Sequence, residues 1–492
     1  MGSGSPRRRW QSKIEMSATL TPATPVAPTV LPSAPAERLS LRDKTVVGIG
    51  GLPIYFGNIT VQSMAIPFYQ MTLHVNPTLL GLALTLPRLW DAMIDPLVGN
   101  ISDNFRSRFG RRRPFIVAGA IAMGLAYGLI WMVPPDWSEA AKLAYFTATA
   151  FLFYTCYAVF SVPYQALTYE ISPDYNDRTR VMANYTAWYK VGDLSYGWIF
   201  PLSQLAIFAT PIIGIRTVGW SVGIFILAMI GLIPGLLGRE RVFHKAVPKA
   251  PAPLRDSVLT AIRHKALLIV IALCLLKVVP SMLASSMDHY LLVYYMNGGD
   301  VALGTSWKAA LSTAYGVVGL VTIPVLAAVA NRWGKPAAMA AVYGLVVIAG
   351  FGKWFLFVPG HTWIVLCDAL FSAPIWVGLS MLLPSMIADI CDEDELNTGH
   401  RREGVFGAMY NWVVKFGISF AFLGTGLLLD LVGFDAKLGG HQDPSTFFWM
   451  RFFFAGVTVT SAVLGVLVAL AYPITREKAA ETRRLLEIRR GT

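Results

Sequence analysis

Long apolar stretches alternate with short polar segments along most of this chain. An apolar stretch of about 18 residues or more predicts a helix long enough to cross the roughly 30 Å core of a bilayer. The pattern predicts twelve such helices, at residues 45–70, 78–101, 114–134, 143–168, 181–206, 217–238, 266–296, 306–330, 337–358, 362–388, 404–432 and 447–472. It therefore indicates an all-α polytopic membrane protein.

A polar segment at residues 239–265 divides the predicted helices into two sets of six, and it contains Lys245, Lys249 and three prolines. The tail at 1–40 is rich in Pro, Ala, Ser and Thr, a composition typical of disorder. We therefore expect five parts: a disordered tail (1–40), a first six-helix bundle (41–238), a cytoplasmic linker (239–265), a second six-helix bundle (266–472) and a cytoplasmic tail (473–492).

Composition and charge agree with a membrane location and predict its orientation. Charged residues make up 14% of the chain, well below the roughly 25% of a soluble domain. The net charge of +12 does not require a nucleic-acid partner, because Lys and Arg collect in the cytoplasmic loops of membrane proteins. Here they occur in every loop that follows an even-numbered helix, and the opposite loops hold little beyond Lys142, Arg216 and Lys437. We expect both termini in the cytoplasm and the protein in the plasma (inner) membrane.

The two halves resemble each other in sequence. The loop ISDNFRSRFGRRRP (101–114) corresponds to VANRWGKP (329–336), between the second and third helices of each half. VPYQALTYEISPDYNDRTR (162–180) likewise corresponds to LPSMIADICDEDELNTGHRREG (383–404). Repeats of six helices are typical of secondary transporters whose binding site lies between the halves.

The second predicted helix carries Arg88, Asp91 and Asp95 inside its apolar stretch. A four-residue step turns an α-helix by only about 40°, so the two carboxylates share one face, and Arg88 lies on that face too. Asp91 is about 20 Å from the start of the helix, near mid-membrane. Charged groups at that depth usually serve a function. A proton or a sodium ion between the carboxylates would make this a coupling site; a static Arg88–Asp91 pair that joins helices is the alternative.

Lys415 lies about 16 Å inside the eleventh predicted helix. An isolated lysine there needs a partner, and the aspartates of the second helix are the natural candidates. The alternative is that the Lys415 side chain extends to the cytoplasmic surface of the membrane.

A family resemblance rests on four segments: RLWDAMIDPLVG (88–99), RSRFGRRRP (106–114), VPYQAL (162–167) and the stretch from Pro384 to Lys415. They resemble the glycoside–pentoside–hexuronide:cation symporters of the major facilitator superfamily, the family that includes the melibiose permease. The resemblance implies the major facilitator fold, with twelve transmembrane helices in two six-helix halves, and symport by alternating access. It also implies that Asp91 and Asp95 form the cation site and that Lys415, with Arg88, is its charge partner.

The chain departs from the family at several positions. Ile94 and Ala158 stand where the melibiose permease has an Asn and a Thr. Because sodium requires several oxygen ligands, we favour a proton as the coupling ion over sodium. Ser161, Gln165 and Thr186 stand near positions where that permease has charged or aromatic sugar-binding residues, so galactoside specificity does not carry over.

The sugar hypothesis requires polar groups beside flat apolar faces. The candidate substrate-binding residues are Tyr55, Gln62, Tyr164, Gln165, Trp188, Lys190, Lys277, Trp376 and Trp412. For each aromatic residue, packing or an interfacial position is the alternative. Lys190 could instead pair with Asp193 at a three-residue step. Lys277 and Asp288 share a helix face. The sequence does not decide what role each of them has.

Charged residues at the predicted cytoplasmic helix ends are candidates for a gate that closes the inner side. They are Asp103, Arg108, Arg112, Glu170, Arg178, Arg180, Asp389 and Arg402. The alternative is that the arginines serve only as topology signals.

The sequence contains no nucleotide-binding loop, dinucleotide fingerprint or His/Cys metal cluster. We therefore expect no enzyme activity and no cofactor, and no metal beyond a possible Na⁺ at Asp91 and Asp95. The expected function is cation-coupled symport of a sugar or glycoside by a monomer in the lipid bilayer, without a nucleic-acid partner. A carrier of lysolipids or other amphipathic compounds is the alternative, and a sensor or enzyme without transport is a more distant one.

Overall fold

The computed structural model describes residues 39–170, 175–238, 264–399, 403–435 and 438–490, and every element in these ranges is helical. The expected disordered tail and most of the expected linker lie outside the described residues. Residues 40–492 form one compact unit.

The first half contains the elements that correspond to predicted helices one to six. They are α2 (Leu41–Gly48), α3 (Gly51–Ala65), η1 (Ile66–Thr72), α4 (Pro77–Asn104), α5 (Arg113–Ile130), α6 (Glu139–Glu170), α7 (Tyr175–Ser195), η2 (Tyr196–Trp198), α8 (Ile199–Ser203), α9 (Pro211–Ser221), η3 (Val222–Ile230) and α10 (Gly231–Leu237).

The second half follows the same plan and ends in an additional helix. Its elements are α12 (Lys265–Tyr290), η4 (Leu291–Met296), α13 (Val301–Trp333), α14 (Lys335–Leu356), η5 (Thr362–Cys367), α15 (Asp368–Ser372), α16 (Pro374–Val377), η6 (Gly378–Leu382), α17 (Leu383–Thr398), α18 (Glu403–Leu431), α19 (Pro444–Leu470) and α20 (Arg476–Arg490). Each of the twelve predicted spans coincides with a helix or a continuous run of helical turns, so the prediction of an all-α fold with twelve membrane helices is confirmed.

Nine helical segments in the described part of the chain are long and apolar enough to span a membrane by composition alone. Predicted helices one, two and five are not among them. Each of these three carries polar groups within its apolar stretch, such as Asn58 on α3, Asp91 and Asp95 on α4, and Lys190 and Asp193 on α7. Predicted helix two, one of these three, holds the candidate cation-binding residues Asp91 and Asp95.

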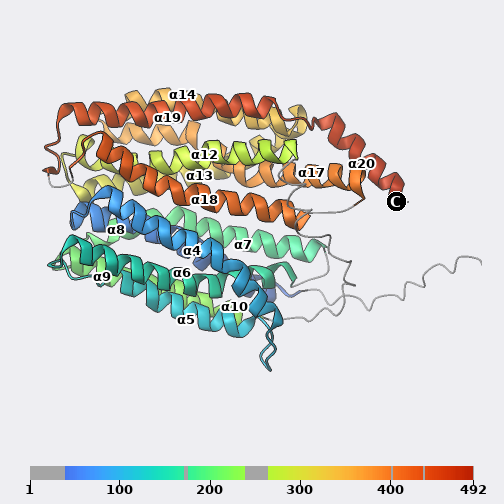
Figure 1. The fold of residues 1–492 in the computed structure, drawn as a ribbon, viewed down its shortest axis with the longest axis horizontal. Helices are drawn as coiled ribbons and strands as arrows, with labels where there is room; N and C mark the ends of the chain where they lie inside the picture. Colours follow the sequence, from blue (N-terminus) through green and yellow to red (C-terminus); the bar gives the residue numbers. More distant parts are fainter. Residues whose placement is uncertain (1–38, 171–174, 239–263, 400–402, 436–437, 491–492) are drawn as a thin grey trace, which may run out of the picture. The chain divides into compact units, whose positions relative to one another are not determined.

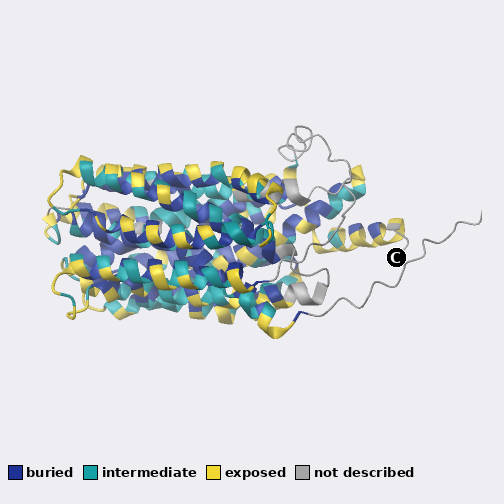
Figure 2. Ribbon diagram, turned by 90° about the horizontal axis from the view of Figure 1, so that it is seen from below, coloured by how far each residue is buried: buried dark blue, intermediate teal, exposed yellow. Residues whose placement is uncertain are grey.

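Helix α4 has two distinct faces. Its large exposed apolar residues recur every three or four positions and are Leu79, Leu82, Leu86, Trp90, Met93, Leu97 and Ile101. Such a stripe is typical of a helix face turned toward lipid. Arg88 and Asp91 are buried on the other side, so the polar face of α4 points into the protein. Figure 2 shows exposed and buried positions alternating along the helices.

Small residues allow close helix packing in the first half. A Cβ atom added to Gly124 on α5 would lie 2.4 Å from the carbonyl oxygen of Gly223 in η3, and the converse distance is also 2.4 Å. Only glycine at both positions permits this approach, which is the usual device of tightly packed membrane helices.

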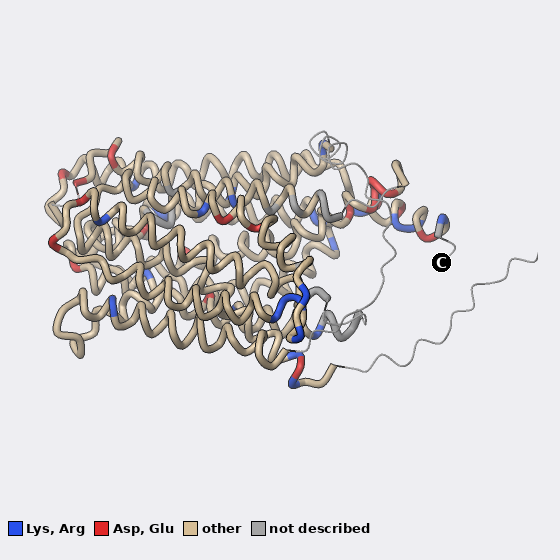
Figure 3. Tube along the Cα trace, turned by 60° about the horizontal axis from the view of Figure 1, so that its bottom comes forward, with Lys and Arg blue, Asp and Glu red and all other residues tan. Residues whose placement is uncertain are grey.

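The halves meet along α4 and α18 and along α7 and α13, in the middle of the view in Figure 1. We call the end that carries Arg106–Arg113 and α20 the basic end, and Figure 3 shows its clustered basic residues. At the other end, which we call the far end, Thr78 Oγ1 lies 2.5 Å from Asp430 Oδ2. Deeper between the halves, Trp198 Nε1 of η2 donates to Thr313 Oγ1 of α13 at 2.9 Å. Described contacts thus join the halves at the far end.

Candidate functional site

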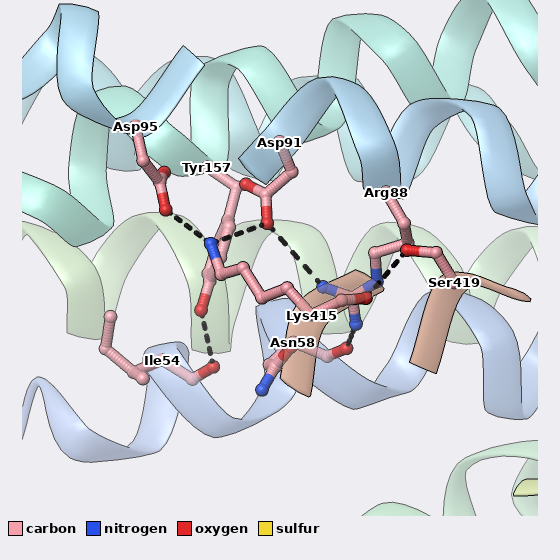
Figure 4. Close-up of polar contacts among 8 residues, drawn as sticks. All are labelled: Ile54, Asn58, Arg88, Asp91, Asp95, Tyr157, Lys415 and Ser419. Atoms are coloured by element: carbon pink, nitrogen blue, oxygen red, sulfur yellow. Dashed lines mark hydrogen bonds and ion pairs between the residues drawn. The ribbon is translucent and has the colours of Figure 1, made fainter. Parts of the chain in front are cut away.

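The carboxylates of Asp91 and Asp95 on α4 converge on the ammonium of Lys415 on α18 (Figure 4). Lys415 Nζ lies 3.2 Å from Asp91 Oδ2 and also forms an ion pair with Asp95. The four-residue step along α4 puts the carboxylates on one face, and the packing of α4 on α18 brings the lysine to them. The three residues predicted from sequence are thus brought together across the two halves.

Arg88 holds Asp91 from the other direction. Its Nη1 lies 3.9 Å from Asp91 Oδ2, one helical turn away. The guanidinium stacks over the ring of Tyr154 at 4.6 Å and donates to the backbone carbonyl of Asn58. These contacts link α3, α4 and α6 and fix the position of Arg88 beside Asp91.

The site contains two carboxylates and two cationic side chains, so it is electrically balanced without a bound ion. Oδ1 of Asp91 and Oδ1 of Asp95 are nevertheless buried and have no hydrogen-bond partner among the described residues. The Asp91 side chain is 2% exposed, whereas those of Asp95 and Lys415 are 28% and 38% exposed. A proton or a hard cation is the ligand that such unpartnered carboxylate oxygens accept, and partial exposure gives it a route of entry.

Described residues contain no group of three or more His, Cys, Asp or Glu side chains placed to hold a metal ion. The donors at this site are two carboxylates, so it is suited to a proton or an alkali cation rather than to a transition metal.

On the first half, the candidate substrate residues Tyr55 and Lys190 are used within the protein. The Tyr55 hydroxyl donates to Asp193 Oδ1 at 2.7 Å, and Lys190 forms an ion pair with the same aspartate. A Cβ atom on Gly319 of α13 would lie 3.8 Å from Lys190 Nζ. This Tyr55–Lys190–Asp193 cluster therefore lies where the halves face each other.

The other first-half candidates differ in environment. Tyr164 is fully buried, donates to the carbonyl of Val47 at 2.8 Å and stacks on Phe160. The structure thus places Tyr164 in the core. Gln62, Gln165 and Trp188 are half-buried, and Gln62 Oε1 has no partner among the described residues.

On the second half, Lys277 lies beside Trp376, with its Nζ 5.5 Å from the ring centroid. Trp412 is exposed and packs against Phe416 at 4.3 Å between ring centroids. Asp288, which shares a helix with Lys277, instead pairs with Lys308 at 2.5 Å.

Lys308 was not among the predicted site residues. The sequence held a usable signal: a lysine near the start of the eighth span follows Asp288, near the end of the seventh, by only 20 residues. A short connection between antiparallel helices brings such positions to the same depth. His289 Nδ1 also approaches Asp288, at 3.5 Å.

The gate candidates are only partly described. Arg402 and the side chains of Asp103, Glu170 and Arg178 lie outside the described residues. Arg108 and Arg180 are exposed, and Arg112 is buried.

Asp389 is buried and accepts from Lys335 and, at 3.1 Å, from Arg483 of α20. Lys478 of α20 pairs with Glu393 at 2.6 Å. Sequence analysis did not foresee these partners, because a basic tail by itself gives no indication of where it docks.

Comparison with known proteins agrees with this fold. The sequence profile of a family described as MFS/sugar transport protein matches residues 46–476, and the chain belongs to this family. It is a membrane transporter of the symporter type in the major facilitator superfamily, and not an enzyme.

The relatives span nearly the whole chain. An uncharacterised symporter of Synechocystis sp. is 27% identical, covering 93% of this chain and 98% of the relative. The sodium-dependent lysophosphatidylcholine symporter 1-B of Danio rerio is 24% identical, covering 92% of this chain and 91% of the relative.

Solved structures share the fold at low sequence identity. A bacterial homologue of the lysosomal transporter Spinster has a TM-score of 0.64 at 14% identity, covering 91% of this chain and 99% of that one. A D-xylose–proton symporter has a TM-score of 0.57 at 14% identity, covering 86% and 96%.

Proposed function

We propose that this protein is a cation-coupled symporter in which Asp91 and Asp95 bind the coupling ion. The Lys415 ammonium competes with that ion for the two carboxylates. The observation that carries the proposal is the contact of one lysine of the second half with two carboxylates of the first. An incoming cation neutralises the carboxylates of Asp91 and Asp95 in place of Lys415. Cation binding is thereby linked to the contact between α4 and α18, and so to the relative position of the halves.

This linkage gives a mechanism for coupling. Without the cation, Lys415 holds the halves together at the site. With the cation bound, Lys415 is released from the carboxylates, and the substrate binds nearby in the space between the halves. Only the empty and the doubly loaded carrier then change between inward-open and outward-open states, as alternating access requires.

We favour a proton as the coupling ion. Ile94 and Ala158 offer no side-chain oxygen, and the site's unpartnered oxygens are Oδ1 atoms of the two carboxylates. A proton needs one oxygen, whereas sodium needs several. The sodium dependence named for the lysophosphatidylcholine symporters makes sodium the specific alternative.

The proposed substrate is a sugar or glycoside. The family description names sugar transport, and half-buried polar and aromatic groups such as Gln62, Gln165 and Trp188 are of the kind that bind hydroxyl groups and ring faces. The second candidate is a lysolipid, because several relatives are named as lysophosphatidylcholine symporters. We further propose a monomer with the five-part organisation given above, in the plasma (inner) membrane with both termini cytoplasmic.

With this orientation the basic end is cytoplasmic, and the contact between Thr78 and Asp430 joins the halves at the outer end.

The test is tracer uptake into proteoliposomes with an imposed proton or sodium gradient. We expect uphill accumulation of a sugar or glycoside under a proton gradient and its loss in Asp95→Asn. Undiminished gradient-driven accumulation by Asp95→Asn would refute the assigned cation site. Accumulation of lysophosphatidylcholine instead of any sugar would select the second candidate.

A further inference from the structure

Lys277 on α12 is buried, at 8% exposure, and forms no ion pair with an acidic residue in the described part of the chain. Four other described lysines deep in the helices pair with aspartates: Lys190 with Asp193, Lys308 with Asp288, Lys353 with Asp368, and Lys415 with Asp91 and Asp95. The described contact of the Lys277 ammonium is the indole face of Trp376, at 5.5 Å.

The acidic group whose charge reaches Lys277 is already neutralised. Asp368 is fully buried and accepts from Lys353 Nζ at 2.7 Å, from Ser372 Oγ at 3.2 Å and from the Tyr315 hydroxyl. Lys353 therefore balances the charge of Asp368 and adds its own repulsion to Lys277. Among the described residues, no acid is left to balance the charge of Lys277.

A lysine in this position is costly to retain. An ammonium at membrane depth without a counter-ion is unfavourable, and such groups usually mark the route of a substrate or ion. The face of Trp376 compensates only part of the cost. An anionic group placed beside Lys277 would supply the missing charge.

Trp376 belongs to a helix face that differs from a lipid-facing one. Its exposed positions follow a four-residue step and are Trp376, Ser380, Pro384 and Ala388. The exposed stripe of α4 consists of Leu, Trp, Met and Ile. A stripe that contains a serine, a proline and an alanine is unlike such a lipid-facing stripe. A Cβ atom on Gly319 of α13 would lie 3.7 Å from Val377 and 3.8 Å from Lys190 Nζ, so the helix turn that carries Trp376 lies near the first half.

We propose that Lys277 and Trp376 form a subsite for an anionic oxygen group, a carboxylate or a phosphate, on the transported molecule. The ammonium pairs with the anion, and the indole packs on the adjoining ring or chain. This inference rests on the proposed transport function and narrows its substrate class. A sugar acid and a lysophospholipid headgroup are the two sources of such a group.

Binding of matched ligand pairs to the purified full-length protein tests the subsite. One pair is methyl glucuronide and methyl glucoside; the other is lysophosphatidylcholine and a monoacylglycerol with the same acyl chain. We expect the member that carries the carboxylate or the phosphate to bind, in one of the two pairs, at least tenfold more tightly than the member without it. The pair that shows this preference identifies the source of the anion.

The preference should disappear in Lys277→Met and persist in Lys277→Arg. Lys265→Met serves as the matched control, because Lys265 is exposed on the same helix, and it should retain the preference. Trp376→Leu, which keeps the charge, should weaken both members of the pair equally and provides a second variant if Lys277→Met does not fold.

The subsite is refuted if neither anionic ligand is preferred by the wild-type protein, or if Lys277→Met keeps the preference. Gradient-driven uptake of a neutral glycoside without any anion preference would refute the subsite and leave the proposed transport function standing. Anion-selective binding without uptake under any gradient would refute the proposed transport function and leave the subsite standing.

Discussion

Lys415 Nζ lies 3.2 Å from Asp91 Oδ2, and this contact joins α18 of the second half to α4 of the first. The two residues are separated by 324 positions in the sequence. This ion pair therefore links the charge of the site to the contact between the two halves.

Asp91→Asn and Asp95→Asn should each abolish gradient-driven accumulation, with a decrease of tenfold or more, because a neutral amide cannot bind the coupling cation. Exchange of substrate at equal concentrations should be less affected, since it requires no net ion movement. Uptake and counterflow in proteoliposomes measure the two activities. Equal loss of both activities would indicate that the aspartates support the fold and not the coupling.

Lys415→Met should increase the affinity for the coupling cation, because the competing ammonium is gone. We expect a shift of about tenfold, which corresponds to about 1.4 kcal/mol; partial exposure of Lys415 and Asp95 keeps the effect modest. The measurement is the ion concentration at which the melting temperature of the purified protein has risen by half of its maximal increase. An unchanged value would show that Lys415 does not compete with the ion.

Lys353→Met should destabilise the second half by about 3–5 kcal/mol, because it leaves the fully buried Asp368 without its cationic partner. The double variant Lys353→Met/Asp368→Asn should recover much of the loss. Thermal unfolding of the purified protein measures both. Equal melting temperatures for the single and double variants would contradict the assigned pair.

Linking Thr78 to Asp430 should stop transport, because their side chains lie 2.5 Å apart at the end where the halves meet. The test replaces both residues with cysteine, in a background in which the four native cysteines are replaced, and adds a short reducible bifunctional thiol reagent. Uptake should fall to background and return on reduction. Each single cysteine variant is a control, and continued uptake by the linked double variant would show that this end does not open during transport.

The sequence by itself determined the number of membrane helices and their division into halves, since the length of an apolar stretch and the position of basic loops are local properties. It also identified Asp91, Asp95 and Lys415, because charged residues deep in apolar stretches are conspicuous. It also named the two aspartates as candidate partners of Lys415, but it did not decide between that contact and extension of the lysine to the interface.

Only the tertiary structure decided the partners. It placed Tyr164 in the core, paired Lys190 with Asp193, gave Asp288 to Lys308 and docked α20 on α17 through Arg483. It also placed the Lys277 ammonium beside the Trp376 ring, without an ion pair to any described acid. Helix periodicity fixes which face a side chain occupies, but the neighbour of that face depends on how helices distant in sequence pack, and that packing is set by the whole membrane-embedded core.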